Sequence, residues 1–320
     1  MNHHGMRRRG RPRWHALVEW GIRLLAGAAL LAIALIFVFI AREALPLLWS
    51  TDARAELRLA DLFLPRQWPG YDAPVFVWQP VGPIPKYNLV PLIVGTFKIT
   101  IMAMLISAPL AIACAVYLAH YSPPRLRELI KPTIEMLAGI PSVVLGFFAL
   151  SLLADLVSAS FGFEYRLNGV VAALALSVTI IPVIFTVSED ALRAVPAAMV
   201  EGARALGARR HQIALRVTLP AALPGVAAAL VLGFGRAIGE TMVVLMASGN
   251  AAVVELFDWS TSVRTMTATI AAELGEVPRG TTHWQVLFLV GILLFALTFA
   301  LNLIAARVVE RTRRRLGGEA

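Results

Sequence analysis

The sequence predicts an all-α integral membrane protein with six transmembrane helices. The chain of 320 residues is 58% hydrophobic and 15% charged, with a mean hydropathy of +0.73. A soluble domain is nearer half apolar and a quarter charged. The apolar residues also gather in runs of about 20 residues or more, the length that crosses a bilayer.

Six apolar runs are candidates for membrane spans. They cover residues 24–40, 90–118, 134–157, 170–187, 223–246 and 286–306. The first follows a basic start and is similar to a signal peptide, but it is too long and no small-x-small cleavage site follows. We therefore expect it to remain as a membrane anchor. The second and third runs are long enough to tilt, kink or extend beyond the bilayer.

The distribution of Lys and Arg predicts the orientation. Nineteen of the twenty-nine lie in the two tails and in the loops 119–133 and 188–222, and eight lie on the opposite side. Basic residues concentrate in short cytoplasmic segments, so both termini are expected in the cytoplasm, as in a multi-pass protein of the bacterial inner membrane. The net charge of +9 then reflects contact with anionic lipid, and no nucleic-acid partner is expected.

The spans divide the chain into three parts. Residues 1–89 hold a basic tail, the first span and an extracytoplasmic loop or cap. Residues 90–308 form the transmembrane domain, and residues 309–320 are a second basic tail. In the outer segment 247–285, apolar residues recur at i, i+4 and i+8: Met266, Ile270 and Leu274. This spacing predicts a short amphipathic helix at the outer interface.

The loop 188–222 carries the most specific pattern in the chain. Pro196 suits the first turn of a helix and Gly207 suits the residue after a helix end, so a short helix is expected between them. A second, basic helix should stop near Leu219 and Pro220. An ordinary amphipathic linker between two spans would also fit this composition.

The spacing within this loop resembles the EAA motif of ABC importer permeases. Glu201-Gly202-Ala203 is followed by three residues, Gly207, nine residues and Val217-Thr218-Leu219-Pro220, against the family pattern E-A-A-x3-G-x9-I-x-L-P. The chain departs from it at Gly202 and Val217, where alanine and isoleucine are usual. The resemblance implies a coupling surface on a separate ATPase, built from Glu201, Gly202, Ala203, Gly207, Leu219 and Pro220.

Three further stretches resemble the phosphate-specific (Pst) ABC permeases. They are LAGIPSVVLGFF (137–148), GRAIGETMVVLMASGN (235–250) and VRTMTATIAAELGE (263–276). The ending GETMVVLMASGN is more similar to the PstC sister than to PstA. The resemblance implies a MetI-like fold over residues 90–308 and inorganic phosphate as cargo. It implies three partners: a PstA-like second permease, a dimer of a PstB-like ATPase and a PstS-like extracytoplasmic phosphate-binding protein.

The chain is not expected to be an enzyme. None of its three lysines, Lys86, Lys98 and Lys131, follows the glycine-rich turn of a P-loop. The six histidines show no metal-ligand spacing, and no G-x-S-x-G nucleophile elbow is present. No catalytic residue, metal site or cofactor is therefore predicted, and ATP hydrolysis is assigned to a separate subunit.

Two charges, Arg236 and Glu240, lie inside the fifth span. An arginine near the middle of a span costs about 2.5–3.5 kcal/mol, so a functional reason is expected. At i, i+4 the two side chains can pair, and mutual neutralisation alone is an alternative. A guanidinium offers several fixed donors to phosphate oxygens, which makes both residues candidates for the translocation path. Gly235 and Gly239 predict close approach of another helix, at a seam between permease subunits.

Three other positions are weaker candidates. Lys98 either lines the path or snorkels from a span end. Ser142 begins or kinks a helix whose free amides can meet an anion. Arg264 lies outside the membrane, where it either contacts a binding protein or is solvated.

Two other functions stay open at this point. The cargo of the same kind of importer can be another oxyanion, such as sulfate or molybdate, because the arginine chemistry is shared. The chain can also be an ion-coupled secondary carrier that works alone, although the EAA-like loop argues against that class.

Overall fold

The computed structural model describes residues 13–252 and 254–316. The beginning of the predicted basic N-terminal tail, residues 1–12, and the end of the C-terminal tail, residues 317–320, lie outside the described residues. The described chain is helical apart from one two-stranded antiparallel hairpin. The predicted all-α class is confirmed.

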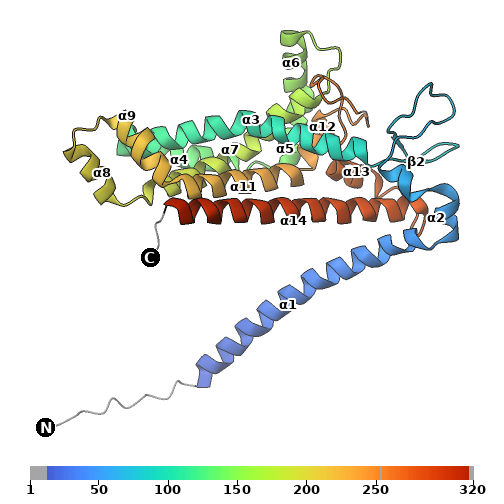
Figure 1. Cartoon of the computed structure of the whole chain (residues 1–320), viewed down its shortest axis with the longest axis horizontal. Coiled ribbons are helices and arrows are strands. Elements are labelled where there is room, and N and C mark those ends of the chain that lie inside the picture. The colour runs from blue at the N-terminus through green and yellow to red at the C-terminus, as the bar shows by residue number, and fades with distance from the viewer. Residues whose placement is uncertain (1–12, 253, 317–320) are drawn as a thin grey trace.

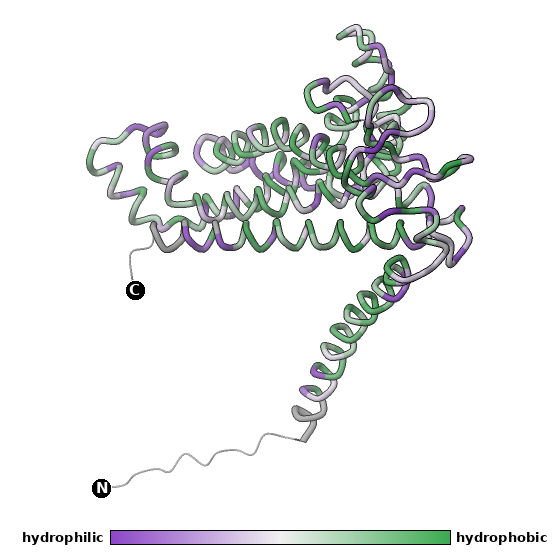
Figure 2. Tube along the Cα trace, turned by 45° about the vertical axis from the view of Figure 1, so that its right-hand side comes forward, coloured by the Kyte–Doolittle hydropathy of each residue, from purple (hydrophilic) through white to green (hydrophobic). Residues whose placement is uncertain are grey.

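Long helices form the body of the molecule (Figure 1). They are α1 (Arg13–Ala44), α3 (Val90–His120), α7 (Gly169–Arg193), α11 (Leu223–Gly239) and α14 (Thr282–Leu316). The helices α3, α7, α11 and α14 lie side by side, whereas α1 leans away and contacts α14 around Phe37–Phe295 and Phe39–Phe288. Figure 2 shows that the long helices are mostly hydrophobic along their length.

The shorter elements lie at the two ends of this bundle (Figure 1). At the end where α8 lies are α4 (Pro124–Leu137), α8 (Ala197–Ala205), α9 (Arg210–Gln212), the π-helix Ile213–Thr218 and α10 (Leu219–Ala221). Toward the other end are α2 (Thr51–Glu56), β1 (Trp78–Gln79), β2 (Lys86–Tyr87), α5 (Ser142–Phe148), α6 (Ala154–Phe161), α12 (Met242–Ala247) and α13 (Met266–Glu273). Three further short segments are the 3-10 turns Leu45–Leu48 and Leu59–Leu62 and the π-helix Ala149–Leu153.

Within the described residues, five helices are long and apolar enough to cross a membrane. A sixth span exists if the bent pair Arg210–Ala221 and Leu223–Gly239, which meet at 69°, is taken as one. The first four predicted spans and the sixth each overlap one of the five continuous helices, and the fifth overlaps Leu223–Gly239 of the bent pair.

The third and fifth spans are each interrupted, and the helix start that the sequence predicts at Ser142 is present in the third. In the third, α4 ends at Leu137 and α5 begins at Ser142. Pro141 causes this break because it lacks an N–H and disfavours helical backbone at the residue before it. In the fifth, α11 ends at Gly239 and α12 begins at Met242.

The main core lies between α3, α7 and α11. Ile180, Ile184 and Phe185 on α7 are fully buried there. The helix α11 packs closely on α7 through two glycines: a Cβ at Gly225 would lie 2.3 Å from the Cβ of Ala191, and one at Gly233 would lie 2.6 Å from Ile184. These glycines, rather than Gly235 and Gly239, set the approach of the two helices within the chain.

We expect Gly225→Ala to lower the thermal stability of the protein in detergent, because the added methyl group overlaps Ala191 in a core that cannot relax fully. A loss of about 1–3 kcal/mol is typical of such overpacking. The matched control is Gly291→Ala on α14, where nothing lies within 4 Å of the new Cβ. That change should raise stability slightly, since glycine is a poor helix former. Equal melting temperatures for the two variants would contradict this packing.

The segment between α1 and α3 folds as a small cap, as the sequence predicts. Its buried side chains include Leu57, Leu62 and Trp78, which share a second core with Met266 and Val286. The predicted helix at 266–274 is present as α13, but its apolar face does not lie open to lipid. Its apolar face packs into this second core instead, because the cap covers it.

A half-buried carboxylate ties the cap to the bundle. Glu273 accepts a hydrogen bond from Trp78 Nε1 at 3.1 Å, lies 2.9 Å from His283 Nε2 and forms an ion pair with Arg264. Burial, with the nearby charges of Glu56 and Glu273, raises the pKa of Tyr87 in the cap to about 12. Tyr87 is therefore uncharged at any physiological pH.

Candidate functional site

The charged positions of the fifth span lie at the break between α11 and α12. Arg236 is in the last turn of α11 and exposed, and Glu240 follows the helix end with an extended backbone. Among the described residues, the carboxylate of Glu240 accepts only the N–H of Thr241, at 3.2 Å, and its backbone oxygen accepts the hydroxyl of Thr267 at 3.0 Å. Glu240 is thus held at the break mainly through its main chain.

The i, i+4 ion pair between Arg236 and Glu240 is not formed. Because α11 ends at Gly239, Glu240 no longer follows the helical path that would place it beside Arg236. Within residues 13–252 and 254–316, no carboxylate forms an ion pair with Arg236. The guanidinium also forms no side-chain hydrogen bond with the part of the chain that the structure describes.

The face of α11 that carries Arg236 is open. Leu232, Arg236 and Gly239 are all exposed on it. A Cβ at Gly239 would meet nothing within 4 Å, and one at Gly235 would lie 3.6 Å from the side-chain oxygen of Asn302. An interrupted membrane helix is tolerated where it is covered by protein or lines a water-filled cavity. The described residues provide neither of these two environments for this face of α11.

Ser142 is the first residue of α5 and is half-buried. Its helix packs against α12 through Gly146, where a Cβ would lie 2.9 Å from the sulfur of Met246. The fold thus brings the Ser142 helix against the helix that follows the break. No hydrogen bond between Ser142 and Arg236 is formed among the described residues.

The EAA-like loop folds at the opposite end of the bundle from α12 (Figure 1). The helix α8 begins one residue after Pro196, and Gly207 follows its end with a φ of +80°. The predicted helix and glycine turn are therefore confirmed. Leu206 is 90% exposed and Met199 is also exposed, so α8 presents two large apolar side chains that sequence analysis did not single out.

The remaining residues of this motif flank that surface. Glu201 and Gly202 are exposed and Ala203 is half-buried on α8. Leu219 and Pro220 lie in α10, where the chain bends by 69° into α11. The motif therefore connects an exposed helix to the membrane helix α11, whose last turn carries Arg236.

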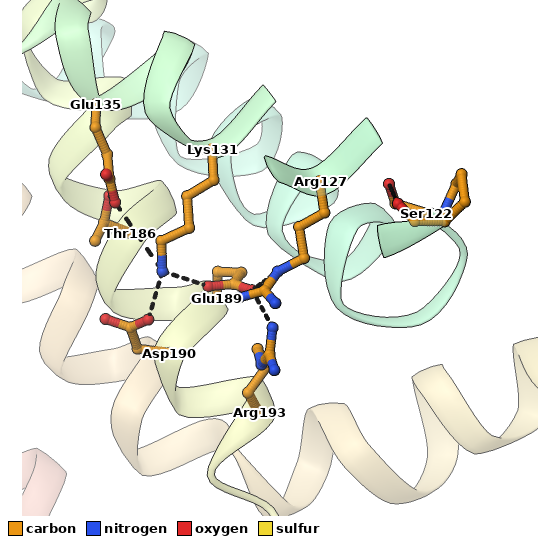
Figure 3. A network of polar contacts seen from close by, with 9 residues as sticks. Ser122, Arg127, Lys131, Glu135, Thr186, Glu189, Asp190 and Arg193 are labelled. Carbon is orange, nitrogen blue, oxygen red and sulfur yellow. Dashed lines mark hydrogen bonds and ion pairs between the residues drawn. The ribbon is translucent and has the colours of Figure 1, made fainter. Parts of the chain in front are cut away.

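A buried acid braces the base of this loop (Figure 3). Glu189 on α7 is fully buried and accepts hydrogen bonds from Arg127 Nε at 2.9 Å and Lys131 Nζ at 2.8 Å, both on α4. Lys131 also bonds to Asp190 at 2.8 Å. Burial alone lowers the pKa of Lys131, but its bonds to Asp190 and Glu189 outweigh burial and leave the pKa raised. Sequence analysis missed this network.

The sequence matches a known family over most of its length. Residues 107–315 fit the family described as the binding-protein-dependent transport system inner membrane component. The chain belongs to this family. It is therefore a permease subunit and not an enzyme, with ATP hydrolysis carried by a separate subunit.

Individual relatives agree with that assignment. The permease is 36% identical over 241 residues to the probable ABC transporter permease protein YqgH of Bacillus subtilis, covering 74% of this chain and 76% of the relative. It is 33% identical over 259 residues to the phosphate transport system permease protein PstC 1 of Mycobacterium tuberculosis, again covering 74% and 76%.

Solved structures confirm the MetI-like fold. One chain of the MetNI methionine ABC transporter in an inward-facing conformation aligns with a TM-score of 0.54 and 20% identity, over 70% of this permease and 97% of that chain. A bacterial alginate ABC transporter aligns with a TM-score of 0.59 and 16% identity, over 97% of this permease and all of that chain. At these identities the likeness shows the fold alone.

The ammonium group of Lys98 is bound by oxygens of a loop distant in sequence. Lys98 is 7% exposed, and its Nζ donates to the backbone oxygen of Glu255 at 2.6 Å, to that of Asp258, and to the hydroxyl of Thr261 at 3.2 Å. The permease thus uses Lys98 to hold the loop that precedes α13. The side chain does not snorkel to water, and its donors are occupied.

We expect Lys98→Met to loosen this loop, because the carbonyl oxygens of Glu255 and Asp258 lose their donor. Chymotrypsin should then cut faster after Phe257, which is already 90% exposed, by about tenfold for a loss near 1.4 kcal/mol. Lys98→Arg, which keeps charge and donors, is the matched control. Unchanged cleavage together with abolished uptake in Lys98→Met would instead place Lys98 on the path.

Arg264 is also engaged within the permease. Besides its ion pair with Glu273, its Nε donates to the hydroxyl of Thr269 at 3.2 Å, and the side chain is 18% exposed. The outer contact proposed for it from the sequence would require a residue with free donors. The structure instead brings Arg264 into the network that fixes the cap.

Proposed function

We propose that this permease translocates inorganic phosphate as the PstC-like subunit of an ABC importer. Relatives named as phosphate transport permeases support the cargo, as do the stretches 137–148, 235–250 and 263–276. The observation that carries the proposal is Arg236. It lies roughly 20 Å along α11 from Leu223, well inside a membrane of about 30 Å, and has no acidic partner among the described residues.

Arg236 supplies what a dehydrating phosphate needs. The anion gives up water reluctantly, and a guanidinium presents several donors in a fixed planar fork that matches its oxygens. The carboxylate of Glu240, at the adjacent helix break, limits how tightly the anion is held and accepts a proton from a protonated phosphate oxygen. Ser142 is a second donor on this path, since its helix packs on α12.

The remaining subunits fit the open surfaces of the permease. A PstA-like second permease covers the face of α11 formed by Leu232, Arg236 and Gly239, and the path runs along that seam. A dimer of a PstB-like ATPase receives α8, whose exposed Met199 and Leu206 supply apolar contact. A PstS-like phosphate-binding protein docks on the cap side.

Uptake of radiolabelled inorganic phosphate tests the cargo. The four proposed subunits are expressed together in cells whose own phosphate importers have been deleted, and uptake should require both the permease and the ATPase. Excess unlabelled phosphate should compete, whereas sulfate and molybdate should not. Competition by sulfate or molybdate at equal concentration would favour the oxyanion alternative. Membership of an ABC permease family argues against a secondary carrier, and uptake that survives loss of the ATPase would restore that possibility.

We propose that the α8 end of the bundle and both termini face the cytoplasm. Reporter fusions after Gly207 or at the C-terminus should be active only as cytoplasmic reporters. Fusions near Asp72 in the cap or near Glu276 should report the extracytoplasmic side. The reason is the excess of Lys and Arg at the α8 end and in the tails. Detection of Asp72 and Gly207 on the same side would contradict this orientation.

A further inference from the structure

A cavity lies beside α8, at the opposite end of the bundle from α12 (Figure 1). Its volume is about 490 Å³, and it is bounded by the end of α3, the start of α4, the end of α7, α8 and the π-helix Ile213–Thr218. It is therefore separate from the break at Arg236. The size is ample for a phosphate group with a few water molecules.

Two buried polar atoms at this cavity have no hydrogen-bond partner within the described residues. They are Oγ1 of Thr218 and Nε2 of His120, and both residues line the cavity. Thr218 is only 1% exposed. Because nearly all buried polar atoms in native proteins are paired, these two atoms indicate that the cavity is built to hold a polar ligand.

The charged residues around the cavity favour an anion. Three arginines line it, Arg127, Arg193 and Arg204, against one lining carboxylate, Glu201. Arg127 directs Nε and Nη2 at the buried Glu189, as Figure 3 shows, and Nη1 is left over. Behind the lining, Glu189 pairs with Arg127, Arg193 and Lys131, and Asp190 pairs with Lys131. The three lining arginines and Lys131 still outnumber the three carboxylates of Glu189, Asp190 and Glu201, so the balance stays positive.

Arg204 differs from the other two lining arginines, which both pair with Glu189. No described carboxylate forms an ion pair with Arg204, although Glu201 lies one helical turn earlier on α8. A guanidinium, a hydroxyl and an imidazole, the last in the tautomer with its proton on Nε2, form a donor set that matches the oxygens of a phosphate group. A cation would meet too many positive charges here, and a neutral ligand would leave the arginine unsatisfied.

We infer that this cavity binds a phosphate group through Arg204, Thr218 and His120. Arg204 belongs to α8, whereas His120 ends α3 and Thr218 ends the π-helix, so a bound phosphate joins α8 to the spans beside it. Given the proposed function, in which α8 transmits ATPase motion on the cytoplasmic side, occupancy restrains that motion. The permease then senses phosphate groups on the side to which it delivers its cargo. The group comes either from free inorganic phosphate or from the headgroup of an anionic lipid.

Calorimetric titration of inorganic phosphate tests the site. The full chain is placed in phosphatidylcholine nanodiscs with Arg236→Gln as background, so that binding at the translocation path does not contribute. One saturable site is expected. Adding Arg204→Gln should weaken binding by about 10- to 100-fold, the range for a charged hydrogen bond, and Thr218→Val by about 3- to 10-fold. Thr218→Ser keeps the donor and should bind nearly as the parent does.

Two controls separate a local effect from misfolding. Arg210→Gln removes an exposed arginine on α9 outside the cavity and should leave binding unchanged. Thr218→Val removes a hydroxyl that has no partner, so the fold should be retained. Amide exchange over residues 197–205 should slow when phosphate is added, and should not slow in Arg204→Gln.

A second arm distinguishes the two sources of the group. If a lipid headgroup occupies the site, nanodiscs that contain phosphatidic acid should show less heat of inorganic phosphate binding in the calorimeter. Native mass spectrometry should then detect the lipid on the parent protein but not on Arg204→Gln. Absence of both phosphate binding and lipid retention would overturn the inference, as would affinity unchanged by Arg204→Gln and Thr218→Val. Either result leaves the proposed function intact, because that function is tested by uptake through Arg236.

Discussion

Replacement of Arg236 by glutamine is expected to abolish phosphate uptake while expression, membrane insertion and assembly with the other subunits survive. Glutamine keeps much of the length and some hydrogen bonding, so the loss reports on charge. Arg236 has no carboxylate partner in the described chain, and its removal therefore leaves no buried acid unpaired. We expect uptake of radiolabelled phosphate to fall at least ~100-fold, as two lost charged hydrogen bonds would produce.

The companion variants separate charge from geometry. Arg236→Lys should recover only part of the uptake, because an ammonium does not reproduce the guanidinium fork. Glu240→Gln should be milder than Arg236→Gln if the carboxylate only tunes the arginine, and about equal if it carries a proton. Glu240→Gln should leave the break intact, since Thr267 bonds to the backbone of Glu240.

The double variant Arg236→Gln with Glu240→Gln tests whether the two charges serve only to neutralise each other. If the charges served only to neutralise each other, removing both would restore uptake. Because α11 ends before Glu240 and the pair is not formed, we expect the double variant to be as inactive as Arg236→Gln. A double variant that transports like the wild type would remove both residues from the translocation path.

The spans were predictable from sequence because hydropathy sums over about 20 residues, and four of the six predicted runs lie within single long helices. The same averaging hides breaks. A window across 134–157 or 223–246 stays apolar even though Pro141 stops one helix and the chain after Gly239 leaves another. The break at Gly239 also depends on Thr267, whose bond to Glu240 joins residues distant in sequence.

The coupling turn was predictable because its cause is local. Gly207 ends a helix whose limits are marked within a dozen residues, and the positive φ follows from that position. The roles of Lys98 and Arg264 were not predictable, because their partners are set by how the loop around residues 255–273 folds. Lys98 bonds to carbonyls more than 150 residues away, which no local pattern reveals. For Glu189, the i, i+4 spacing of Arg127 and Lys131 was the available signal, since it places two cations on one face of α4.

Substitution of Gly207 by valine is expected to abolish uptake by disconnecting ATP hydrolysis from the membrane helices. At φ +80° a β-branched residue is strained by about 1–3 kcal/mol, so the turn after α8 should rearrange. Nothing lies within 4 Å of an added Cβ at Gly207, and the rest of the fold should be unaffected. The measurement compares phosphate uptake with ATPase activity of the purified importer in liposomes.

Gly202→Ala is the matched control for this variant. Gly202 also has nothing within 4 Å of a new Cβ, but it lies inside α8 with ordinary helical backbone. Alanine there should stabilise α8 by up to about 1 kcal/mol and keep uptake coupled. If Gly207→Val transported normally, the turn would not need its left-handed backbone, and α8 would not be the element that carries ATPase motion. If both variants failed alike, the defect would lie in the volume of the docking face and not in the turn, because only Gly207 requires a positive φ.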